Sequence, residues 1–384
     1  MLPENQKIVI VSPAYPYRGG QALVEAYMYN TFTNLGYDCN TISYKLLYPS
    51  VFFPGTTQFD ESKVIPFEHT SRIKRIINSI NPFTWYKAAK EIRKIDPEIV
   101  IIVWWMPFFG PALSTIARLI KKSKKTKVVF LVENYISHEK RWFDSLSTKL
   151  SLKYADAFIC QSKYIHEQIT KDFVGKPIHQ TTLSIYDCYD LNRYNKKSAR
   201  EFLGIKTDNV ILFFGLIRAY KGLDKLIVAF KEILKTRPDT TLLIVGECYE
   251  NIKKYTDLIE QMGLRDKTIL INNFIPNEKI EPYFKAADLS CLPYNSGTQS
   301  GILMMAYGFK IPVVVTDVGG VAELVVNEET GIIIPDNGLD NLVRGINQIL
   351  TNKQTINYSN NIQNFTKGLG YSSLGTFVQS VLQD

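Results

Sequence analysis

The sequence predicts an α/β fold made of two Rossmann-like domains, each a doubly wound parallel sheet flanked by helices. The chain has 384 residues, which is enough for two domains of typical size. Uniformly apolar runs, such as residues 99–105 and 312–316, are typical of strands buried in parallel sheets. Two of the predicted strands, residues 7–12 and 210–214, lead through glycine-containing loops into helical segments, as in alternating β and α units.

The domain boundary is predicted from a stretch that lacks any periodicity. Residues 184–197 read as a linker between two periodic regions. We therefore assign residues 1–190 to an N-terminal Rossmann-like domain and residues 191–368 to a C-terminal one. Residues 369–384 are expected to form a final helix, over about 371–382.

The composition of the chain limits the kinds of molecule that it is expected to bind. The formal net charge is +8 and the pI is about 9.0, which favours an anionic partner. No module that reads RNA or DNA is visible, so nucleic acid is not expected. The five cysteines are widely spaced, which argues for a reducing compartment, and no apolar run approaches the roughly 20 residues that span a bilayer. With no signal peptide at the start, a cytoplasmic location is predicted.

Residues 292–323 contain the first candidate binding element. A loop at residues 295–297 precedes Ser300 and Gly301, which open an apolar segment of helical length. The start of a helix presents unpaired backbone N–H groups and a positive dipole end, so it attracts phosphate. Gly319 and Gly320 predict a tight turn, with Glu323 on a following helix. A strand–helix–strand unit without a ligand is the alternative interpretation.

Residues 213–222, FFGLIRAYKG, contain the second element. A buried strand ends in Gly215, and Arg218 and Lys221 follow before a helix. Arginine and lysine in this position can hold phosphate oxygens and stabilise a leaving group that gains negative charge. Two cations that follow a strand by chance are the alternative.

Together these motifs resemble those of the retaining glycosyltransferases of family 4. The family's pattern around FGR and KG is similar to residues 213–222, and its PVV-T-D-GG--E pattern is similar to residues 312–323. The resemblance implies the GT-B fold, in which two Rossmann-like domains face a cleft and the last helix crosses back to the first domain. It implies sugar transfer from a nucleoside diphosphate sugar to a glycan or lipid-linked acceptor, with retention and with no metal or other cofactor.

The resemblance also implies a set of site residues. Arg218 and Lys221 would act on the leaving diphosphate. The donor-binding residues would be Gly19, Gly20, Arg218, Lys221, Phe274, Thr298, Gln299, Ser300, Gly301, Ile302, Leu303 and Glu323.

Two features depart from the family pattern. The paired glutamates, which contact the sugar and the ribose in the family, correspond here to Gly297 or Thr298 and to Met305. We assign the chain to a subgroup with a degenerate glutamate-pair motif and favour a variant active site over an inactive one. The family's His-Asn pair is replaced by Glu133 and Asn134, with His138 further along the loop. We predict that Glu133 and His138 line the transfer site, where such groups can act as acid or base. A structural role for the histidine is the alternative.

Two surface regions admit two interpretations each. The aromatic stretch 44–70 is either part of the acceptor site or a flap packed on its own domain. The basic and aromatic stretch 71–95 is either a solvated helix face or a surface that attaches to anionic lipid. Peripheral attachment to the inner membrane face would suit polysaccharide, capsule or lipopolysaccharide biosynthesis. The alternatives to a transferase are a nucleotide-sugar epimerase or hydrolase of GT-B type, and a catalytically inert GT-B binding subunit.

Overall fold

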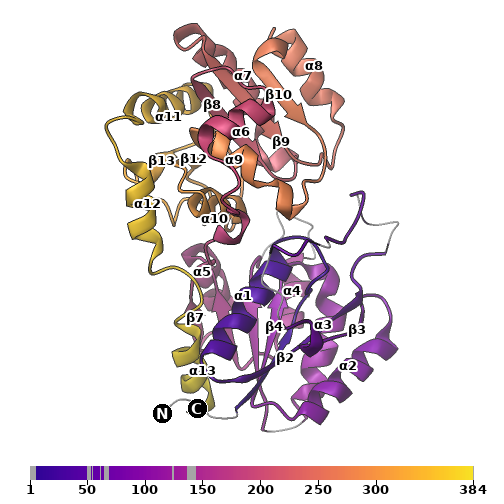
Figure 1. The fold of residues 1–384 in the computed structure, drawn as a ribbon. Helices are drawn as coiled ribbons and strands as arrows, with labels where there is room; N and C mark the ends of the chain where they lie inside the picture. Colours follow the sequence, from indigo (N-terminus) through magenta and orange to yellow (C-terminus); the bar gives the residue numbers. More distant parts are fainter. Residues whose placement is uncertain are drawn as a thin grey trace. The chain divides into compact units, whose positions relative to one another are not determined.

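The computed structural model describes residues 6–49, 53, 55–60, 62–64, 69–122, 125–135 and 144–383. The chain divides into two compact units, which are drawn in Figure 1. Unit 1 comprises Met1–Ser184 and Leu369–Asp384, and unit 2 comprises Ile185–Gly368. Each unit is built around one parallel sheet, so the predicted α/β class with two doubly wound sheets is confirmed.

Unit 1 contains a seven-stranded sheet in the order β3-β2-β1-β4-β5-β6-β7. Its strands and helices are β1 (Lys7–Val11), α1 (Gly20–Asn34), β2 (Asp38–Leu46), β3 (Ile73–Asn78), α2 (Pro82–Ile95), β4 (Ile99–Trp104), α3 (Gly110–Ile120), β5 (Lys127–Val132), α4 (Asp144–Leu152), β6 (Ala157–Cys160), α5 (Lys163–Asp172), β7 (Ile178–Gln180) and α13 (Leu374–Gln383). The strand order reverses direction between β1 and β4. In open α/β sheets ligands bind at such a switch point, beyond the carboxyl ends of the strands.

The helices of unit 1 follow from this order. The connection from β1 to β2 runs in one direction along the sheet, and the connections from β3 onward run in the other. Because crossovers are right-handed, α1 lies on one face, whereas α2, α3 and α4 lie on the opposite face. The central strands are apolar throughout and completely buried, as a sheet covered on both faces requires.

Unit 2 contains a six-stranded sheet in the order β10-β9-β8-β11-β12-β13. Its strands and helices are α6 (Lys196–Leu203), β8 (Asn209–Phe214), α7 (Leu223–Thr236), β9 (Thr240–Val245), α8 (Lys253–Gln261), β10 (Thr268–Ile271), α9 (Glu281–Ala286), β11 (Leu289–Leu292), α10 (Gly301–Gly308), β12 (Val313–Thr316), β13 (Gly331–Ile334), α11 (Leu339–Asn352) and α12 (Tyr358–Thr366). Here the switch point lies between β8 and β11, which pair through Leu289 and Ile211.

The C-terminal segment packs against unit 1. The Gln379 side-chain amide donates to the Tyr37 hydroxyl at 2.7 Å, and the Gln161 amide donates to the Tyr371 hydroxyl at 2.6 Å. Helix α13 buries Leu374 and Val378. These contacts fix the end of the chain on the N-terminal sheet (Figure 1). In the described part of the chain, no helix combines the length and the apolar character that crossing a bilayer requires.

Two expectations about individual elements were wrong. The stretch 71–95, interpreted as one basic surface or helix face, contains the edge strand β3 as well as α2. In β3, Ile73 and Ile77 are buried and the cations Lys74 and Arg75 are exposed, as suits an edge strand. Asn81 then caps α2 by accepting from the Phe83 N–H at 3.1 Å.

The second correction concerns Glu323, which lies in a turn region and not on a helix. Gly319 has a φ of +55°, and its backbone lies so close to the Gly297 carbonyl that a Cβ would be 1.8 Å from the oxygen. The chain is held here as a tight turn by the loop beside it, so no helix begins at this point.

Candidate active site

In unit 2, the segments that follow β8 and β11 meet at the switch point. Gly215 ends β8 with a φ of +100°, which glycine adopts readily. A Cβ at this position would lie 3.2 Å from the Lys221 Nζ and 2.9 Å from the Ile302 Cδ1. Gly215, the Lys221 ammonium group and the first turn of α10 therefore occupy one place.

Hydrogen bonds lock the two loops together. The backbone N–H of Asn295 donates to the Tyr220 carbonyl at 2.7 Å, and the Asn295 side-chain amide donates to the Ala219 carbonyl at 3.1 Å. Asn337 in turn donates to the Asn295 side-chain oxygen at 2.6 Å. The loop that carries Arg218 and Lys221 thus has a fixed position relative to the loop that leads into α10.

The two cations are backed by tyrosine rings. The Arg218 guanidinium lies 5.1 Å from the ring centroid of Tyr249, and the Lys221 Nζ lies 5.5 Å from that of Tyr294. Lys221 is only 8% exposed. Burial, together with the nearby charge of Arg218, lowers the pKa of Lys221 to about 8. Two neighbouring cations, one of them desolvated, form a site where an anion is favoured.

The start of α10 adds backbone donors to this site. The Ser300 hydroxyl caps the helix by accepting from the Leu303 N–H at 3.4 Å. The N–H groups of Gly301 and Ile302 have no acceptor within the helix. A helix start beside Lys221 can therefore supply both N–H groups and a positive dipole end to a phosphate.

The remaining predicted donor residues differ in their surroundings. Thr298, in the loop before α10, and Leu303, in the first turn of α10, are both buried. The Oε1 atom of Gln299 is buried without a hydrogen-bond partner among the described residues. Phe274 follows β10, two strands from β8, and Glu323 is exposed. The structure therefore brings Arg218 and Lys221 together with the start of α10, and the place of Phe274 in the donor site stays a prediction.

The missing glutamates have a structural counterpart. A Cβ on Gly297 would lie 2.4 Å from the Val321 Cγ2, so a side chain there would require Val321 to shift. Met305 is buried among apolar neighbours within α10. The departure from the family pattern is thus built into the packing of the loop.

In unit 1, a carboxyl group lies at the corresponding end of the sheet. Glu133 directly follows β5 and is only 4% exposed. Its Oε2 accepts from the Gln21 side-chain amide at 2.9 Å, and Gln21 directly follows Gly19 and Gly20 at the start of α1. Burial raises the pKa of Glu133 to about 7, and the hydrogen bond from Gln21 opposes part of this shift. His138, the other predicted group, lies outside the described residues.

Several of these contacts were not anticipated from the sequence. Gln21 is separated from Glu133 by 112 positions, and only its place after two glycines marked it. Tyr249 and Tyr294 each follow an apolar strand closely, which is the one signal that they share.

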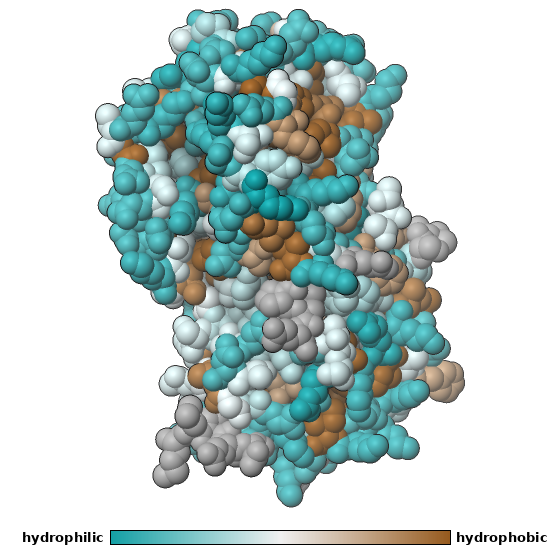
Figure 2. Space-filling model, in the orientation of Figure 1, coloured by the Kyte–Doolittle hydropathy of each residue, from teal (hydrophilic) through white to brown (hydrophobic). Residues whose placement is uncertain are grey.

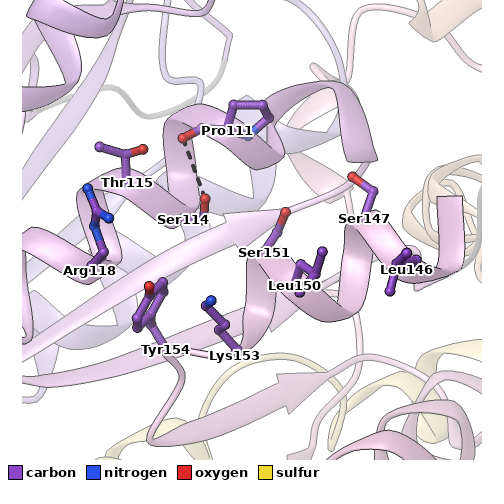
Figure 3. A pocket seen from close by; sticks show the side chains of 10 residues that line it. All are labelled: Pro111, Ser114, Thr115, Arg118, Leu146, Ser147, Leu150, Ser151, Lys153 and Tyr154. Carbon is purple, nitrogen blue, oxygen red and sulfur yellow. Dashed lines mark hydrogen bonds between the residues drawn. The ribbon is translucent and has the colours of Figure 1, made fainter. Parts of the chain in front are cut away.

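A separate surface groove lies between α3 and α4 in unit 1 (Figure 3). It has a volume of about 500 Å³ and is lined by residues that include Arg118, Leu146, Leu150 and Lys153. The groove contains none of the predicted site residues. The candidate active site is therefore the one at the carboxyl ends of the strands and not this groove.

Comparisons with known proteins find similarity to glycosyltransferases. Residues 195–367 match the family described as glycosyl transferases group 1. The chain is 27% identical over 285 residues to the putative glycosyltransferase YtcC of Bacillus subtilis, and the alignment covers 68% of this chain and 69% of YtcC. It is 26% identical over 170 residues to a D-inositol 3-phosphate glycosyltransferase of Kribbella flavida, where the alignment covers 42% of this chain and only 40% of the relative.

Solved structures show the same fold over the whole chain. Anabaena HepE in complex with UDP-glucose has a TM-score of 0.76 at 16% identity, covering 98% of this chain and 99% of HepE. Sucrose-phosphate synthase from Thermosynechococcus elongatus has a TM-score of 0.74 at 17% identity, covering 98% of each chain. The fold is therefore the GT-B fold. The segment that matches the glycosyl transferases group 1 family includes Arg218, Lys221 and α10.

Proposed function

We propose that this chain is a retaining, metal-independent hexosyltransferase of family 4 that moves a sugar from a nucleoside diphosphate sugar to a glycan or lipid-linked acceptor. The observation that carries the proposal is the meeting of Arg218, Lys221 and the start of α10 at the switch point of the unit 2 sheet. The structures of HepE with UDP and with UDP-glucose support a donor of this kind on the same fold.

The chemistry follows from charge. When the bond between sugar and diphosphate breaks, negative charge develops on the leaving phosphate. Fixed cations and N–H dipoles that face this charge stabilise the transition state more than the ground state. Arg218, Lys221 and the α10 N–H groups supply this charge from the chain itself, and so we propose that no metal ion is needed.

The missing glutamates leave the sugar contact to other groups. Gln299 has a buried amide oxygen without a protein partner in the described region, beside the start of α10. An unpaired buried acceptor is costly, and a hydroxyl of the donor sugar would satisfy it. We assign Gln299 and Thr298 to the sugar end of the donor site.

The proposal is tested first by donor binding. Thermal-shift screening against UDP-, GDP-, dTDP- and ADP-sugars should give stabilisation by at least one donor. The Arg218→Ala, Lys221→Ala double variant should lose this shift. Lys225→Ala, which removes an exposed cation in the first turn of α7, is the matched control and should keep it.

Turnover assays distinguish the transferase from the alternative functions. The binding donor, mixed with glycan or polyprenyl-linked acceptors, should give a product with retained anomeric configuration by NMR, with undiminished rate in EDTA. Donor consumption without an acceptor would favour the epimerase or hydrolase. Binding without any turnover would favour the inert subunit. If no donor stabilises the protein, the proposed function is wrong.

A peripheral location on the inner membrane face is part of the proposal. Figure 2 shows a largely hydrophilic surface with smaller apolar patches. On α2, Phe83 is 85% exposed and Tyr86 is also exposed, and Lys87 and Lys90 lie on the same solvent-facing side. Exposed aromatic residues beside cations suit the interface of an anionic bilayer. Such a location would fit assembly of a capsule, lipopolysaccharide or related polysaccharide.

A further inference from the structure

Glu133 is a buried carboxyl group that has no cationic partner within the part of the chain that the structure describes. It is 4% exposed, and its backbone N–H donates to the Trp104 carbonyl at 2.8 Å, which extends the pairing of β5 with β4 by one residue. Within the described residues, no lysine, arginine or histidine forms an ion pair with it. An unpaired carboxylate in such surroundings is strongly disfavoured, so the group is expected to hold its proton near neutral pH.

The neighbouring ionisable groups are engaged elsewhere. On α1, Glu25 contacts the His69 ring nitrogen at 3.1 Å. Before α1, the Arg18 guanidinium lies 5.3 Å from the Phe53 ring centroid. Beyond Glu133, the Tyr135 hydroxyl donates to Asp172 at 2.5 Å. At the end of β4 and directly after it lie Trp104 and Trp105, which do not titrate. Among the described residues, the pKa of Glu133 is raised by burial, and the hydrogen bond from Gln21 opposes this shift.

Gln21 determines how this carboxyl group is oriented. Its amide reaches Glu133 from the start of α1, which follows β1, while Glu133 follows β5. Strand β4 lies between β1 and β5, so the hydrogen bond spans the carboxyl end of β4, at the switch point. The Gln21 amide N–H donates to the Glu133 Oε2, so Oε2 acts as a hydrogen-bond acceptor. In the neutral acid the proton is then on Oε1.

We propose that Gln21 is a positioning residue that presents Glu133 as a neutral acid, with the Oε1 hydroxyl donating a hydrogen bond to an oxygen of a bound substrate. The inference rests on the proposed function and specifies it: this end of the unit 1 sheet takes an uncharged oxygen, such as a hydroxyl or ring oxygen of a sugar. A carboxylate would repel an anionic substrate and could not donate, so the protonated form is the competent one.

Carboxyl titration tests the local claim without any turnover. With 13C-carboxyl-labelled glutamate, the signal that disappears in Glu133→Gln identifies the residue. We expect its midpoint near pH 7. Gln21→Leu removes the donor that favours the charged form and should raise the midpoint. Gln21→Lys supplies a cation and should lower it by about 1–3 units. Gln180→Leu, at an exposed glutamine of the same unit, should leave it unchanged.

Turnover gives the second readout. The rate should fall as the pH rises through about 7 in the wild type, with the fall moved upward in Gln21→Leu and downward in Gln21→Lys. If the Gln21 variants do not fold, Glu133→Gln serves instead: its amide N–H cannot ionise in this pH range, so whatever rate the variant retains should no longer fall as the pH rises through about 7.

The outcomes keep the two proposals apart. A Glu133 midpoint near that of an ordinary glutamate, or one insensitive to Gln21, overturns this inference even if sugar transfer is observed. Titration that follows Gln21 in a protein that transfers no sugar supports the local geometry and contradicts the proposed function alone.

Discussion

The carboxyl ends of the two sheets have the same topology and opposite chemistry. In unit 2, the switch point between β8 and β11 carries two cations and a helix start. In unit 1, the switch point between β1 and β4 carries a buried carboxyl group held by a neutral amide. Burial acts on both ends in the same sense, because it disfavours charge: the pKa of Lys221 is lowered to about 8 and that of Glu133 is raised to about 7. The protein thus shifts the pKa of both groups toward neutral pH, where a small change in pH changes their charge.

The largest expected effect removes the cations of unit 2. Hydrogen bonds to charged groups contribute roughly 1.5–3 kcal/mol each, so Arg218→Ala or Lys221→Ala alone should slow transfer by about 10- to 100-fold. The double variant should lose about 100- to 10,000-fold in kcat/KM. Circular dichroism and thermal unfolding should show that it remains folded. Near-normal turnover in the folded double variant would contradict the transferase mechanism.

The next effect concerns stability and the carboxyl of unit 1. The folded pKa of Glu133 is above its ordinary value of 4.5, so its favourable contribution is present below pH 4.5 and is lost as the pH rises through about 7. Glu133→Gln should remove this loss. Above pH 7 the variant should exceed the wild type by up to about 3 kcal/mol in the free energy of unfolding, measured with urea.

Two controls accompany the unfolding measurement. At pH 4 the difference between Glu133→Gln and the wild type should nearly vanish. Glu167→Gln, at an exposed position on α5, should give no pH-dependent difference. A Glu133→Gln variant that is less stable than the wild type at pH 8 would show that the carboxyl is ionised and stabilising.

A smaller effect is expected on the pH dependence of nucleotide binding to unit 2. Lys221 must be protonated to hold a diphosphate, and its pKa in the free protein is about 8. Binding of a nucleoside diphosphate should therefore weaken as the pH rises above 8, by about tenfold at pH 9. Lys221→Arg keeps its charge and should bind with little change over this range. Isothermal titration calorimetry at pH 7, 8 and 9 measures the difference, and an equal pH dependence in both proteins would exclude Lys221 as its source.

The smallest effect concerns the membrane surface. Phe83→Asp on α2 should reduce recovery with anionic liposomes in a flotation assay at low salt, because it removes an exposed aromatic residue and adds a negative charge beside cations that each contribute on the order of 1 kcal/mol at such a surface. Phe202→Asp, at a similarly exposed phenylalanine of α6, is the control. Equal recovery of the wild type with neutral and anionic liposomes would remove the membrane proposal.

Sequence patterns were informative for those candidate site residues that lie close to one another along the chain. Strand, glycine, arginine and lysine lie within ten residues, so the β8 loop and the start of α10 were both visible as patterns. They were less informative where the partner is distant. Nothing local paired Gln21 with Glu133, or placed Tyr249 and Tyr294 beside the cations, because those contacts arise from strand order.

The misassigned elements have the same origin. The isoleucines of β3 are spaced in a way that also suits a helix face, and only its pairing with β2 fixes it as a strand. The region around Glu323 is held as a turn by the contact between Gly319 and the Gly297 carbonyl, 22 positions earlier in the chain. Local preference was overridden by packing in both cases.

The central claim is that Arg218, Lys221 and the start of α10 form a diphosphate site. A crystal structure of the protein with the nucleoside diphosphate that stabilises it most would test this directly. We expect phosphate oxygens within hydrogen-bonding distance of the Lys221 Nζ and of the Gly301 or Ile302 N–H, with the Arg218 guanidinium on the same diphosphate. A diphosphate bound elsewhere, such as the groove between α3 and α4, would contradict it.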